Sequence, residues 1–279
     1  MAGGAVTRFA PSPTGPLHLG HAFSALIALE RARGGTFLLR IEDIDRARCR
    51  SDHEAAIYDD LRWLGLSWPE PVLRQSERLN FYAEALENLN EIGVTYPCRC
   101  SRADIRSALS APQEGAPATG PDGPVYPGTC RGCGLPSDGA AIRLDMRRAL
   151  ALVGPPEFEE TGPDHMGPQI KYAQYLIENV GDIVLARRDI GTSYHLAVVV
   201  DDAAQGITEV VRGLDLFEAT MIHVLLQRLL GLPVPAYHHH RLIRDAEGRR
   251  LAKRDDARAL AKYRAEGATP QDIRRMIGF

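Results

Sequence analysis

The sequence contains no long apolar run and no segment typical of a leader peptide. Over its 279 residues, no stretch is long and apolar enough to span a bilayer. The first residues, MAGGAVTRFAPSP, lack the basic-then-apolar pattern of a secretory signal. These absences exclude a helical membrane protein, and we expect a cytoplasmic protein without a membrane partner.

The chain is also poor in cysteine and in net charge. Its formal net charge is −3, which excludes a chain coated in positive charge but leaves room for a local basic stripe that binds nucleic acid. There are five cysteines: Cys49, Cys98, Cys100, Cys130 and Cys133. Four of them lie in one short stretch, and in a reducing compartment such clustering favours a metal over disulfides.

What the sequence does contain is a large apolar fraction, 44%, arranged as alternating strands and helices. An apolar strand at 6–10 leads into a Pro/Gly-rich loop, a helix at 17–32 and a second strand at 36–41. This order is typical of an α/β fold, and we predict a Rossmann-type parallel sheet that binds a nucleotide. Further predicted helices are 52–64, 77–92 and 217–230, and further predicted strands lie near 183–185, 196–200 and 207–211.

A small inserted module interrupts this alternation. Residues 111–127 are rich in Pro, Gly and Ala without periodicity, and they separate the two clustered cysteine pairs. We predict a flexible loop within a zinc-binding module, and spacing alone suggests all four clustered cysteines as ligands. Reduced cysteines without a metal are the alternative. The predicted division is 1–97 and 183–240 as the two halves of the catalytic domain, 98–182 as the module, and 241–279 as a basic loop followed by helices.

The sharpest motif is RFAPSPTGPLHLGH, residues 8–21. Gly15 and Gly20 carry no side chain, so backbone and phosphate can approach closely, and the loop feeds a helix whose N-terminus favours an anion. His18 and His21 share one helix face and can donate hydrogen bonds to phosphate oxygens. We therefore predict that His18, Gly20 and His21 bind ATP and that both histidines are catalytic. The alternative is a turn followed by a helix with two satisfied histidines.

A second motif, RRLAKRD, lies in the basic stretch 241–262. Lys253 within it can reach the phosphates of ATP and stabilise the charge that develops as pyrophosphate leaves. We predict an ATP-binding and catalytic role for Lys253. Taken alone, a solvated basic loop is the commoner meaning of such a run.

Together the two motifs resemble the signatures of class I aminoacyl-tRNA synthetases. HLGH at 18–21 stands where that class has H-I-G-H, and RLAKR at 250–254 stands where it has K-M-S-K-S. The departures are Arg250 for the first lysine and Ala252 for the serine, whose hydroxyl is lost. The opening RFAPSPTGPLHLGH, then LLRIEDID, YHLAVVVDD and VVRGLDL, look like the glutamyl branch of the class.

Glutamate brings two carboxylates and one ammonium, so its site requires at least two cations and one buried anion. Arg8 and Arg212 each end an apolar strand, where α/β sheets bind ligands, and arginine holds a carboxylate in a two-pronged fork. Glu42 ends another strand and can pair with the ammonium. For any one arginine alone, a salt bridge at the sheet edge is the alternative. The resemblance implies a pocket of Arg8, Phe9, Ala10, Pro11, Ser12, Glu42, Tyr194 and Arg212.

The resemblance also suggests a different zinc ligand set. The glutamyl-queuosine branch binds zinc through C-x-C, a tyrosine and one cysteine, which matches Cys98, Cys100, Tyr126 and Cys130. Cys133 is then a rival to Tyr126, at the common C-x-x-C spacing. We expect one structural zinc per chain.

Only about 25 residues follow Lys253, and we expect no room for the helical anticodon-binding region of a full glutamyl-tRNA synthetase. The chain in this respect resembles the glutamyl-queuosine tRNA(Asp) synthetases. That resemblance implies activation of L-glutamate with ATP without tRNA, then transfer to the queuosine base in the anticodon loop of tRNA(Asp). We expect Mg²⁺ with the ATP, and a monomer.

Three alternatives remain at this point. One is a shortened conventional glutamyl-tRNA synthetase, and another is a ligase that joins an amino acid to a small molecule. A third is a non-catalytic zinc module that binds RNA, which His18, His21 and Lys253 argue against.

Overall fold

The computed structural model describes residues 4–109, 119–244 and 258–279. The chain begins with a parallel three-stranded sheet of order β1-β2-β3. Val6 faces Thr36 across the first pair, and Arg40 faces Leu73 across the second. The elements of this part are β1 (Val6–Phe9), α1 (Leu19–Ala32), β2 (Thr36–Ile41), α2 (Ser51–Trp63), β3 (Leu73–Arg74), the 3₁₀ turn η1 (Gln75–Glu77) and α3 (Leu79–Glu91).

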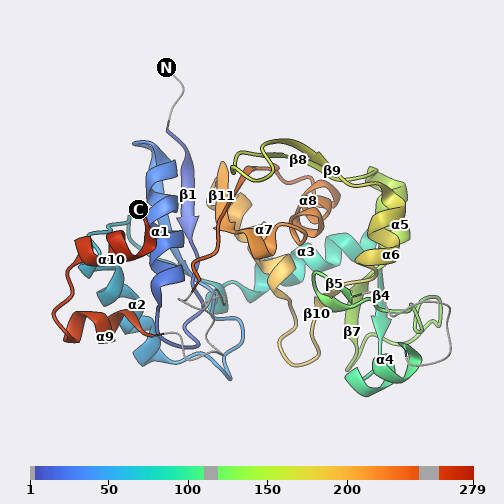
Figure 1. The fold of residues 1–279 in the computed structure, drawn as a ribbon. Coiled ribbons are helices and arrows are strands. Elements are labelled where there is room, and N and C mark those ends of the chain that lie inside the picture. The colour runs from blue at the N-terminus through green and yellow to red at the C-terminus, as the bar shows by residue number, and fades with distance from the viewer. Residues whose placement is uncertain (1–3, 110–118, 245–257) are drawn as a thin grey trace.

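A second sheet lies beside β1, in the order β11-β12-β8-β9 (Figure 1). Its β11-β12 and β12-β8 pairs are parallel, and β8-β9 is an antiparallel hairpin. The Thr208 N–H donates to the carbonyl of Val6 at 3.0 Å and ties the edge of β11 to β1. The predicted α/β fold with a parallel sheet is therefore confirmed. The strands are β8 (Glu157–Glu160), β9 (Gly167–Ile170), β11 (Glu209–Gly213) and β12 (Ala236–His240).

Helices α7 (Tyr194–Ala204) and α8 (Thr220–Leu229) pack against each other, and α8 also contacts β8. The 3₁₀ turn η2 (Leu214–Leu216) precedes α8. The predicted strand at 196–200 is wrong, because those residues lie inside α7. Ser193 caps the helix by accepting from the Leu196 N–H. Leu196, Ala197, Val198 and Val199 are all buried, so their unbroken apolar run reflects burial on every side rather than the period of a strand.

A separate antiparallel sheet, of order β10-β7-β4, lies at the predicted module (Figure 1). Its central strand β7 lies within 98–182, whereas β4 begins before these bounds and β10 follows them. The predicted flexible loop is corrected in part: residues 110–118 lie outside the described residues, but 119–124 form a tight hairpin. We retain the boundaries of the module as a proposal; β8, within 98–182, pairs with β12 of the second sheet. The elements are β4 (Thr95–Cys98), α4 (Arg102–Leu109), β5 (Thr119–Gly120), β6 (Gly123–Pro124), β7 (Ala141–Leu144), α5 (Met146–Val153), α6 (Ala173–Asn179) and β10 (Val184–Ala186).

The chain ends in two helices, α9 (Leu260–Ala265) and α10 (Pro270–Ile277), which lie beside α1 and α2 (Figure 1). Thr269 and Asp272 form a capping box that starts α10. Leu260, Ile273 and Ile277 join the core cluster built around α1. None of the helices in the described ranges has the length and apolar character needed to cross a membrane.

Candidate active site

The first predicted ATP motif forms the start of α1. His18 is the N-cap: its Nδ1 accepts from the Gly20 N–H at 3.1 Å, while Nδ1 of His21 accepts from the His18 N–H at 3.2 Å. Because both Nδ1 atoms accept, each neutral imidazole carries its proton on Nε2. The two rings lie 3.8 Å apart between centroids. The capping box therefore prepares two Nε2–H donors at the positive end of a helix.

Gly20 is required at this turn by the ring of His18. A Cβ on Gly20 would lie 3.0 Å from Cε1 and 3.1 Å from Nδ1 of His18, closer than most Cβ contacts. A side chain here would push on the imidazole or break its bond to the Gly20 N–H. The glycine thus holds the cap that fixes the tautomer of His18.

Lys253 lies outside the described residues. The chain that follows it returns to the first motif, because Ala259 pairs with His18 as an isolated β-bridge. The Leu260 N–H donates to the carbonyl of Leu17 at 2.8 Å. Lys253 is therefore only six positions before Ala259, which pairs with His18.

Four of the predicted glutamate-pocket residues converge at the C-terminal ends of β1, β2 and β11. Arg8 lies on β1, Arg212 lies on β11, and Glu42 directly follows β2. Tyr194 is the first residue of α7. Burial raises the pKa of Tyr194, and the charges of Glu42, Arg212 and Arg8 all act on its hydroxyl. The structure thus brings together the two cations and one anion that a glutamate site requires.

The guanidinium of Arg8 is held by a carboxylate that the sequence did not single out. Its Nε donates to Oδ1 of Asp202 at 2.9 Å and its Nη2 to Oδ2 at 3.1 Å. Asp202 also accepts from Nη1 of the fully buried Arg40 at 2.6 Å. Burial alone would raise the pKa of Asp202, but Arg8 and Arg40 outweigh it and hold this pKa below its usual value. The predicted fork of Arg8 is therefore directed at Asp202.

Glu42 lies in the same buried charge network. Its Oε1 accepts from Arg40 Nη2 at 3.1 Å, and its N–H donates to the carbonyl of Pro11 at 3.0 Å. Burial raises the pKa of Glu42, while the neighbouring charges of Arg40 and Arg8 oppose the rise. A substrate ammonium would add a further cation beside this carboxylate and favour its charged form.

Arg212 is surrounded by acceptors on three sides. Its Nε donates to His239 Nε2 at 3.2 Å and its Nη1 bonds His223 Nδ1 at 3.0 Å. Its Nη2 donates to the hydroxyl of Thr220 at 2.6 Å and to the carbonyl of Leu216 at 3.3 Å. Within the described residues, the second Nη1 hydrogen is the one left for a ligand. Arg212 thus offers a ligand its charge and one N–H rather than a two-pronged fork.

Behind Arg212, His239 is fixed by a buried glutamate. His239 Nδ1 lies 2.5 Å from Glu160 Oε2, and the backbone N–H of His239 donates to Oε1 at 2.9 Å. Burial would raise the pKa of Glu160, but the hydrogen bonds from His239 and from the backbone of Gly162 keep it below the usual value. Burial lowers the pKa of His239. A neutral His239 therefore carries its proton on Nδ1 and leaves Nε2 to accept from Arg212.

The remaining predicted pocket residues line the loop after β1. The side chain of Phe9 packs in the core around α1, so only its backbone can face a ligand. Ala10 and Ser12 are half-buried, whereas Pro11 is buried with its carbonyl bound to Glu42. The structure thus groups this loop with Arg8 and Glu42.

The predicted zinc residues form a compact group in the module. Among the described residues, the sulfurs of Cys98, Cys100 and Cys130 lie within 4.8 Å of one another, a spacing that could hold a metal ion. The Tyr126 hydroxyl lies 3.4 Å from both Cys98 Sγ and Cys100 Sγ, and the sulfurs of Cys100 and Cys130 are 3.5 Å apart. A tetrahedral zinc with usual bond lengths places its ligand atoms about 3.5–3.8 Å apart. These three distances are close to this spacing, so the donor set fits a zinc ion.

Cys133, the rival fourth ligand, is exposed and points elsewhere. Its sulfur lies 3.4 Å from the carbonyl of Thr129 and is absent from the three-cysteine group. The Tyr126 hydroxyl instead accepts from the Cys130 N–H at 2.9 Å. Burial opposes ionisation of Cys130, but hydrogen bonds from Tyr126 and the Arg99 backbone outweigh it and bring the Cys130 pKa to about 7. Burial and the cysteine contacts raise the pKa of Tyr126, which a bound cation would reverse.

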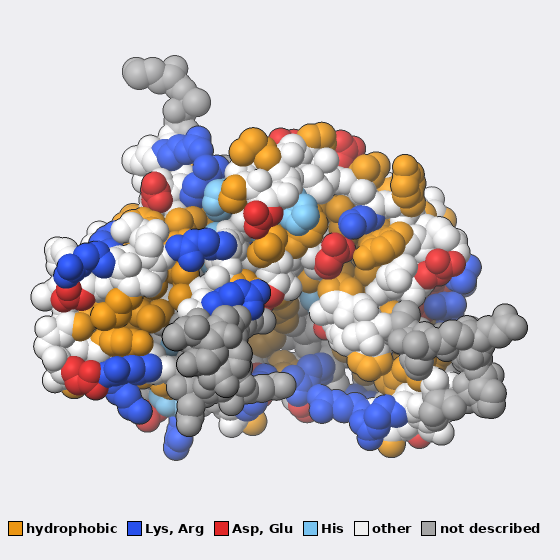
Figure 2. Space-filling model, viewed as in Figure 1, with side chains coloured by type: hydrophobic (Ala, Val, Ile, Leu, Met, Phe, Trp, Pro, Cys, Tyr) orange, Lys and Arg blue, Asp and Glu red, His pale blue; other side chains and the backbone are white. Residues whose placement is uncertain are grey.

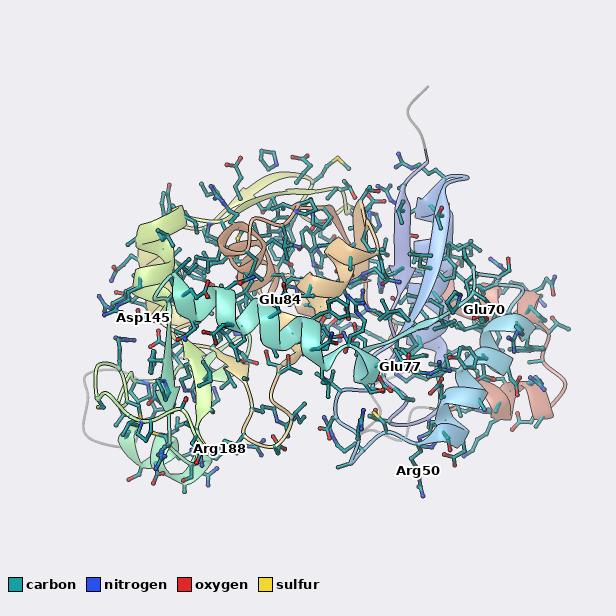
Figure 3. All side chains as sticks on the ribbon, turned by 180° about the vertical axis from the view of Figure 1, so that it is seen from behind. Arg50, Glu70, Glu77, Glu84, Asp145 and Arg188 are labelled. Atoms are coloured by element: carbon teal, nitrogen blue, oxygen red, sulfur yellow. The ribbon has the colours of Figure 1, made fainter. Side chains whose placement is uncertain are left out.

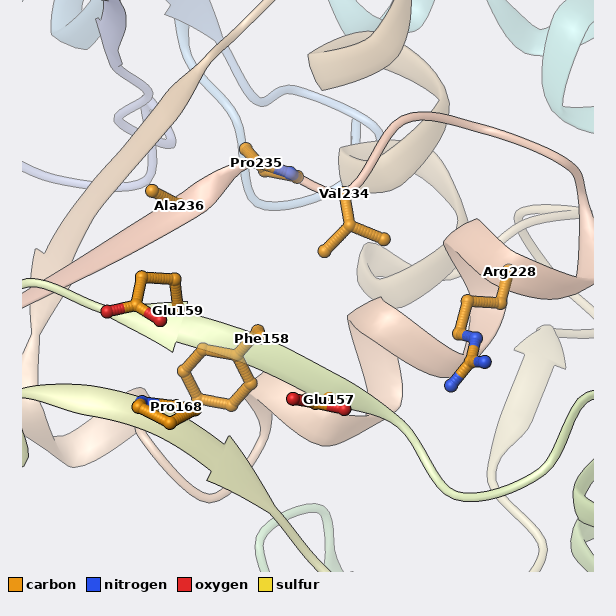
Figure 4. Close-up of a pocket in the computed structure, with 8 residues that line it drawn as sticks. All are labelled: Glu157, Phe158, Glu159, Pro168, Arg228, Val234, Pro235 and Ala236. Atoms are coloured by element: carbon orange, nitrogen blue, oxygen red, sulfur yellow. The ribbon is translucent and has the colours of Figure 1, made fainter.

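A separate surface hollow of about 470 Å³ lies between the β8–β9 hairpin and the start of β12 (Figure 4). Its polar groups are two strand carboxylates and one arginine, which bonds the carbonyl of Pro155. None of the predicted site residues lines it. The hollow is formed by Glu157, Phe158, Glu159, Pro168, Arg228, Val234, Pro235 and Ala236.

Comparison with known proteins agrees with this geometry. The family model for the catalytic domain of class I tRNA synthetases for Glu and Gln matches residues 5–130 and 156–278. The chain belongs to this family. A glutamyl-Q tRNA(Asp) synthetase of Rhodobacter capsulatus is 65% identical over 281 residues, which cover 98% of this chain and 100% of that protein. Another, from Symbiobacterium thermophilum, is 44% identical and covers 95% of this chain and 83% of its own length.

Solved structures of glutamate tRNA ligases have a similar fold. A glutamate tRNA ligase from Elizabethkingia meningosepticum, solved in complex with its amino acid, superposes with a TM-score of 0.74 at 28% identity. The match covers 95% of this chain but only 58% of that ligase. This chain therefore spans little more than half of a glutamate tRNA ligase, whereas it spans all of the Rhodobacter relative.

Reasoning from the sequence missed the residues that support the candidate pocket. Arg40, Asp202, Glu160, His223 and His239 are all buried and bond to one another or to the predicted residues. A usable signal existed in two cases, because Arg40 interrupts the apolar strand TFLLRI and Asp202 closes the apolar run of α7. A charged residue inside such a run must find a buried partner.

Proposed function

We propose that this chain activates L-glutamate with ATP to glutamyl-adenylate without tRNA, and then transfers the glutamate to the queuosine base in the anticodon loop of tRNA(Asp). The observation that carries the proposal is the 65% identity to a glutamyl-Q tRNA(Asp) synthetase along that protein's whole length. Clustering of Arg8, Glu42 and Arg212 at the C-terminal ends of β1, β2 and β11 supports the choice of glutamate. By the same proposal the protein works as a monomer in the cytoplasm.

In the first step, a glutamate carboxylate oxygen attacks the α-phosphate of ATP and pyrophosphate leaves. The Nε2–H groups of His18 and His21 donate to phosphate oxygens as charge develops, and Lys253 neutralises the departing pyrophosphate. Glu42 pairs with the substrate ammonium, and Arg8 and Arg212 provide the positive field for its carboxylates. Mg²⁺ accompanies the ATP.

In the second step, a hydroxyl of the queuosine ring attacks the activated carbonyl and AMP leaves. The chain's main contribution is to position the two reactants and to exclude water. Its net charge is −3, but exposed Lys and Arg side chains gather at the lower edge (Figure 2). Arg50 and Arg188 reach this edge from the two halves of the molecule (Figure 3). Such an edge suits the phosphate backbone of an RNA.

The module contributes a structural zinc in this proposal. Cys98, Cys100 and Cys130 supply three thiolates and Tyr126 the fourth ligand. The group is closed and lies apart from the ATP motifs, so bound zinc would fix the fold of the module and leave the reaction to other residues.

The decisive experiment uses labelled glutamate, ATP and tRNA with or without queuosine. We expect glutamate-dependent ATP–pyrophosphate exchange without tRNA, and label only on queuosine-containing tRNA(Asp). An absolute need for tRNA in the exchange would contradict the first half of the proposal. Label on the 3′ end of a glutamate tRNA would instead identify a conventional glutamyl-tRNA synthetase activity.

A further inference from the structure

A chain of hydrogen bonds connects Arg212 to the inserted module through two buried histidines. Arg212 Nη1 lies 3.0 Å from His223 Nδ1 on α8, and His223 Nε2 lies 3.0 Å from His195 Nδ1 on α7. His195 Nε2 then lies 3.3 Å from Oδ1 of Asp122, in the turn of the β5–β6 hairpin. One series of polar contacts thus connects strand β11, two helices and the β5–β6 hairpin.

The donors and acceptors of this hydrogen-bond series run in one direction, which is set by Arg212. A guanidinium only donates, so His223 Nδ1 must accept and its proton must lie on Nε2. That Nε2–H donates to His195 Nδ1, which places the proton of His195 on Nε2, facing Asp122. The carboxylate of Asp122 only accepts, so it completes the series. Every ring nitrogen of His223 and His195 then has a hydrogen-bond partner of the correct kind.

The two histidines of this hydrogen-bond series are buried, so losing a partner there is costly, whereas Asp122 at its outer end is accessible to solvent. His223 and His195 are 2% and 7% exposed, whereas the side chain of Asp122 is 47% exposed. Burial and the charge of Arg212 hold the pKa of His223 well below 6.5, so it stays neutral. Tyr194 packs edge-on against both rings, with centroids 5.5 Å apart in each case. The two imidazoles therefore contact two of the predicted pocket residues.

We propose that His223 and His195 are positioning residues for Arg212, and that Asp122 anchors the outer end of the series, so that docking of the module's hairpin sets the affinity for glutamate. This inference rests on the proposed function, in which Arg212 binds the substrate. Without an acceptor at position 122, the His195 Nε2–H loses its partner and the ring can rotate or change tautomer. The change in His195 then disturbs the hydrogen bond to His223 and, through it, the orientation of the Arg212 guanidinium. The remaining Nη1–H of Arg212 is then less well directed at glutamate.

The test uses the full chain and three exposed-site variants. Asp122→Ala removes the acceptor, Asp122→Asn keeps an acceptor oxygen, and Asp164→Ala is the control at an exposed aspartate between β8 and β9. In ATP–pyrophosphate exchange, Asp122→Ala should raise the KM for glutamate about three- to tenfold, the size of one hydrogen bond. The KM for ATP and kcat should change by less than about twofold. Asp122→Asn should recover most of the affinity, and Asp164→Ala should match the wild type.

A glutamate KM that stays unchanged in Asp122→Ala, or an equal rise in the KM for ATP, would overturn the proposal. Nitrogen-15 NMR of the histidine rings provides a second readout that does not require activity. It should show the proton on Nε2 in both His195 and His223, and on Nδ1 in His239. An Nδ1 proton on His223 would refute the series even in an active enzyme. Absence of exchange in the wild type would instead count against the proposed function alone.

Discussion

Arg8 and Arg212 direct most of their N–H groups to the protein and few to open space. Arg8 is paired with Asp202, and Arg212 with His239, His223 and Thr220. Each is thereby held rigid before any ligand arrives, at the expense of the bidentate contact that the sequence suggested. A charged side chain with a fixed position gives a stronger preorganised field than one that must reorient.

Replacing Arg8 by lysine tests this arrangement. The ammonium of lysine cannot reach both oxygens of Asp202, so Arg8→Lys should lower the free energy of unfolding by about 2 kcal/mol. It should also raise the KM for glutamate, because the cation moves. Urea unfolding and pyrophosphate exchange measure the two effects, with Arg106→Lys on exposed α4 as the control. Wild-type stability together with wild-type KM would show that the bidentate pair has no such role.

Gly20→Ala is the matching test at the ATP motif. The new Cβ would press on the ring of His18, 3.0 Å away, and disturb the cap that leaves the proton on Nε2. Alanine suits a helix better than glycine does, so stability should change by less than about 1 kcal/mol while kcat for adenylation falls. Thermal melting and pyrophosphate exchange separate the two. A variant with normal kcat would mean that the cap does not govern the reactivity of His18.

The sequence indicated candidate site residues where the signal is local, and it missed the partners that are distant along the chain. Arg8, Glu42 and Arg212 stand at strand ends, a position readable from a short window. Asp202 could not be paired with Arg8 in advance, because 194 residues separate them. Glu160 and His239 are likewise joined only by the register of β8 beside β12.

At the scale of elements, α7 illustrates why an apolar run does not define a strand. Its sequence YHLAVVVDDAA is rich in β-branched residues, which favour strands in isolation. The helix forms because it is packed against α8, α3 and β10, and tertiary burial overrides that preference. The ends of β1, α1 and β2 were predicted within two residues, since Pro, Gly and the N-cap mark them locally.

Strand β12 carries three consecutive histidines, and they make the fold sensitive to acid. Burial lowers the pKa of His238, His239 and His240, as it does for His223 on α8. The unfolded chain therefore binds protons near pH 6.5 that the folded chain excludes. Stability should fall as pH drops below about 6.5, by up to about 1.4 kcal/mol per pH unit for each histidine.

Urea unfolding at several pH values checks this expectation. His240→Asn is the informative variant, because its amide can still donate to the carbonyl of Arg241 but does not titrate. Its stability should depend less steeply on pH than that of the wild type. Asp202 and Glu160, whose pKa values are lowered, should add to the loss only below about pH 4.5. Stability that rises between pH 7 and pH 5.5 would rule the account out.

At the scale of the molecule, the zinc module should be stable only with its metal. One zinc per chain is expected in fresh protein by elemental analysis. Cys130→Ser should lose the zinc and lower the melting temperature, whereas Cys133→Ser should keep both unchanged. Tyr126→Phe should bind zinc more weakly through the three remaining thiolates. Zinc lost in Cys133→Ser and retained in Tyr126→Phe would assign the fourth ligand to Cys133.

The pairing of Arg8 and Arg40 with Asp202 has a consequence for synthesis of the chain on the ribosome. Both arginines emerge early, yet their shared carboxylate follows 194 and 162 residues later. Until then, closing β1 and β2 over the first helix would bury Arg8 without a counter-ion and would leave Arg40 paired with Glu42 alone, which is unfavourable. The nascent N-terminal sheet must therefore stay open to solvent, within reach of chaperones, until α7 has left the exit tunnel.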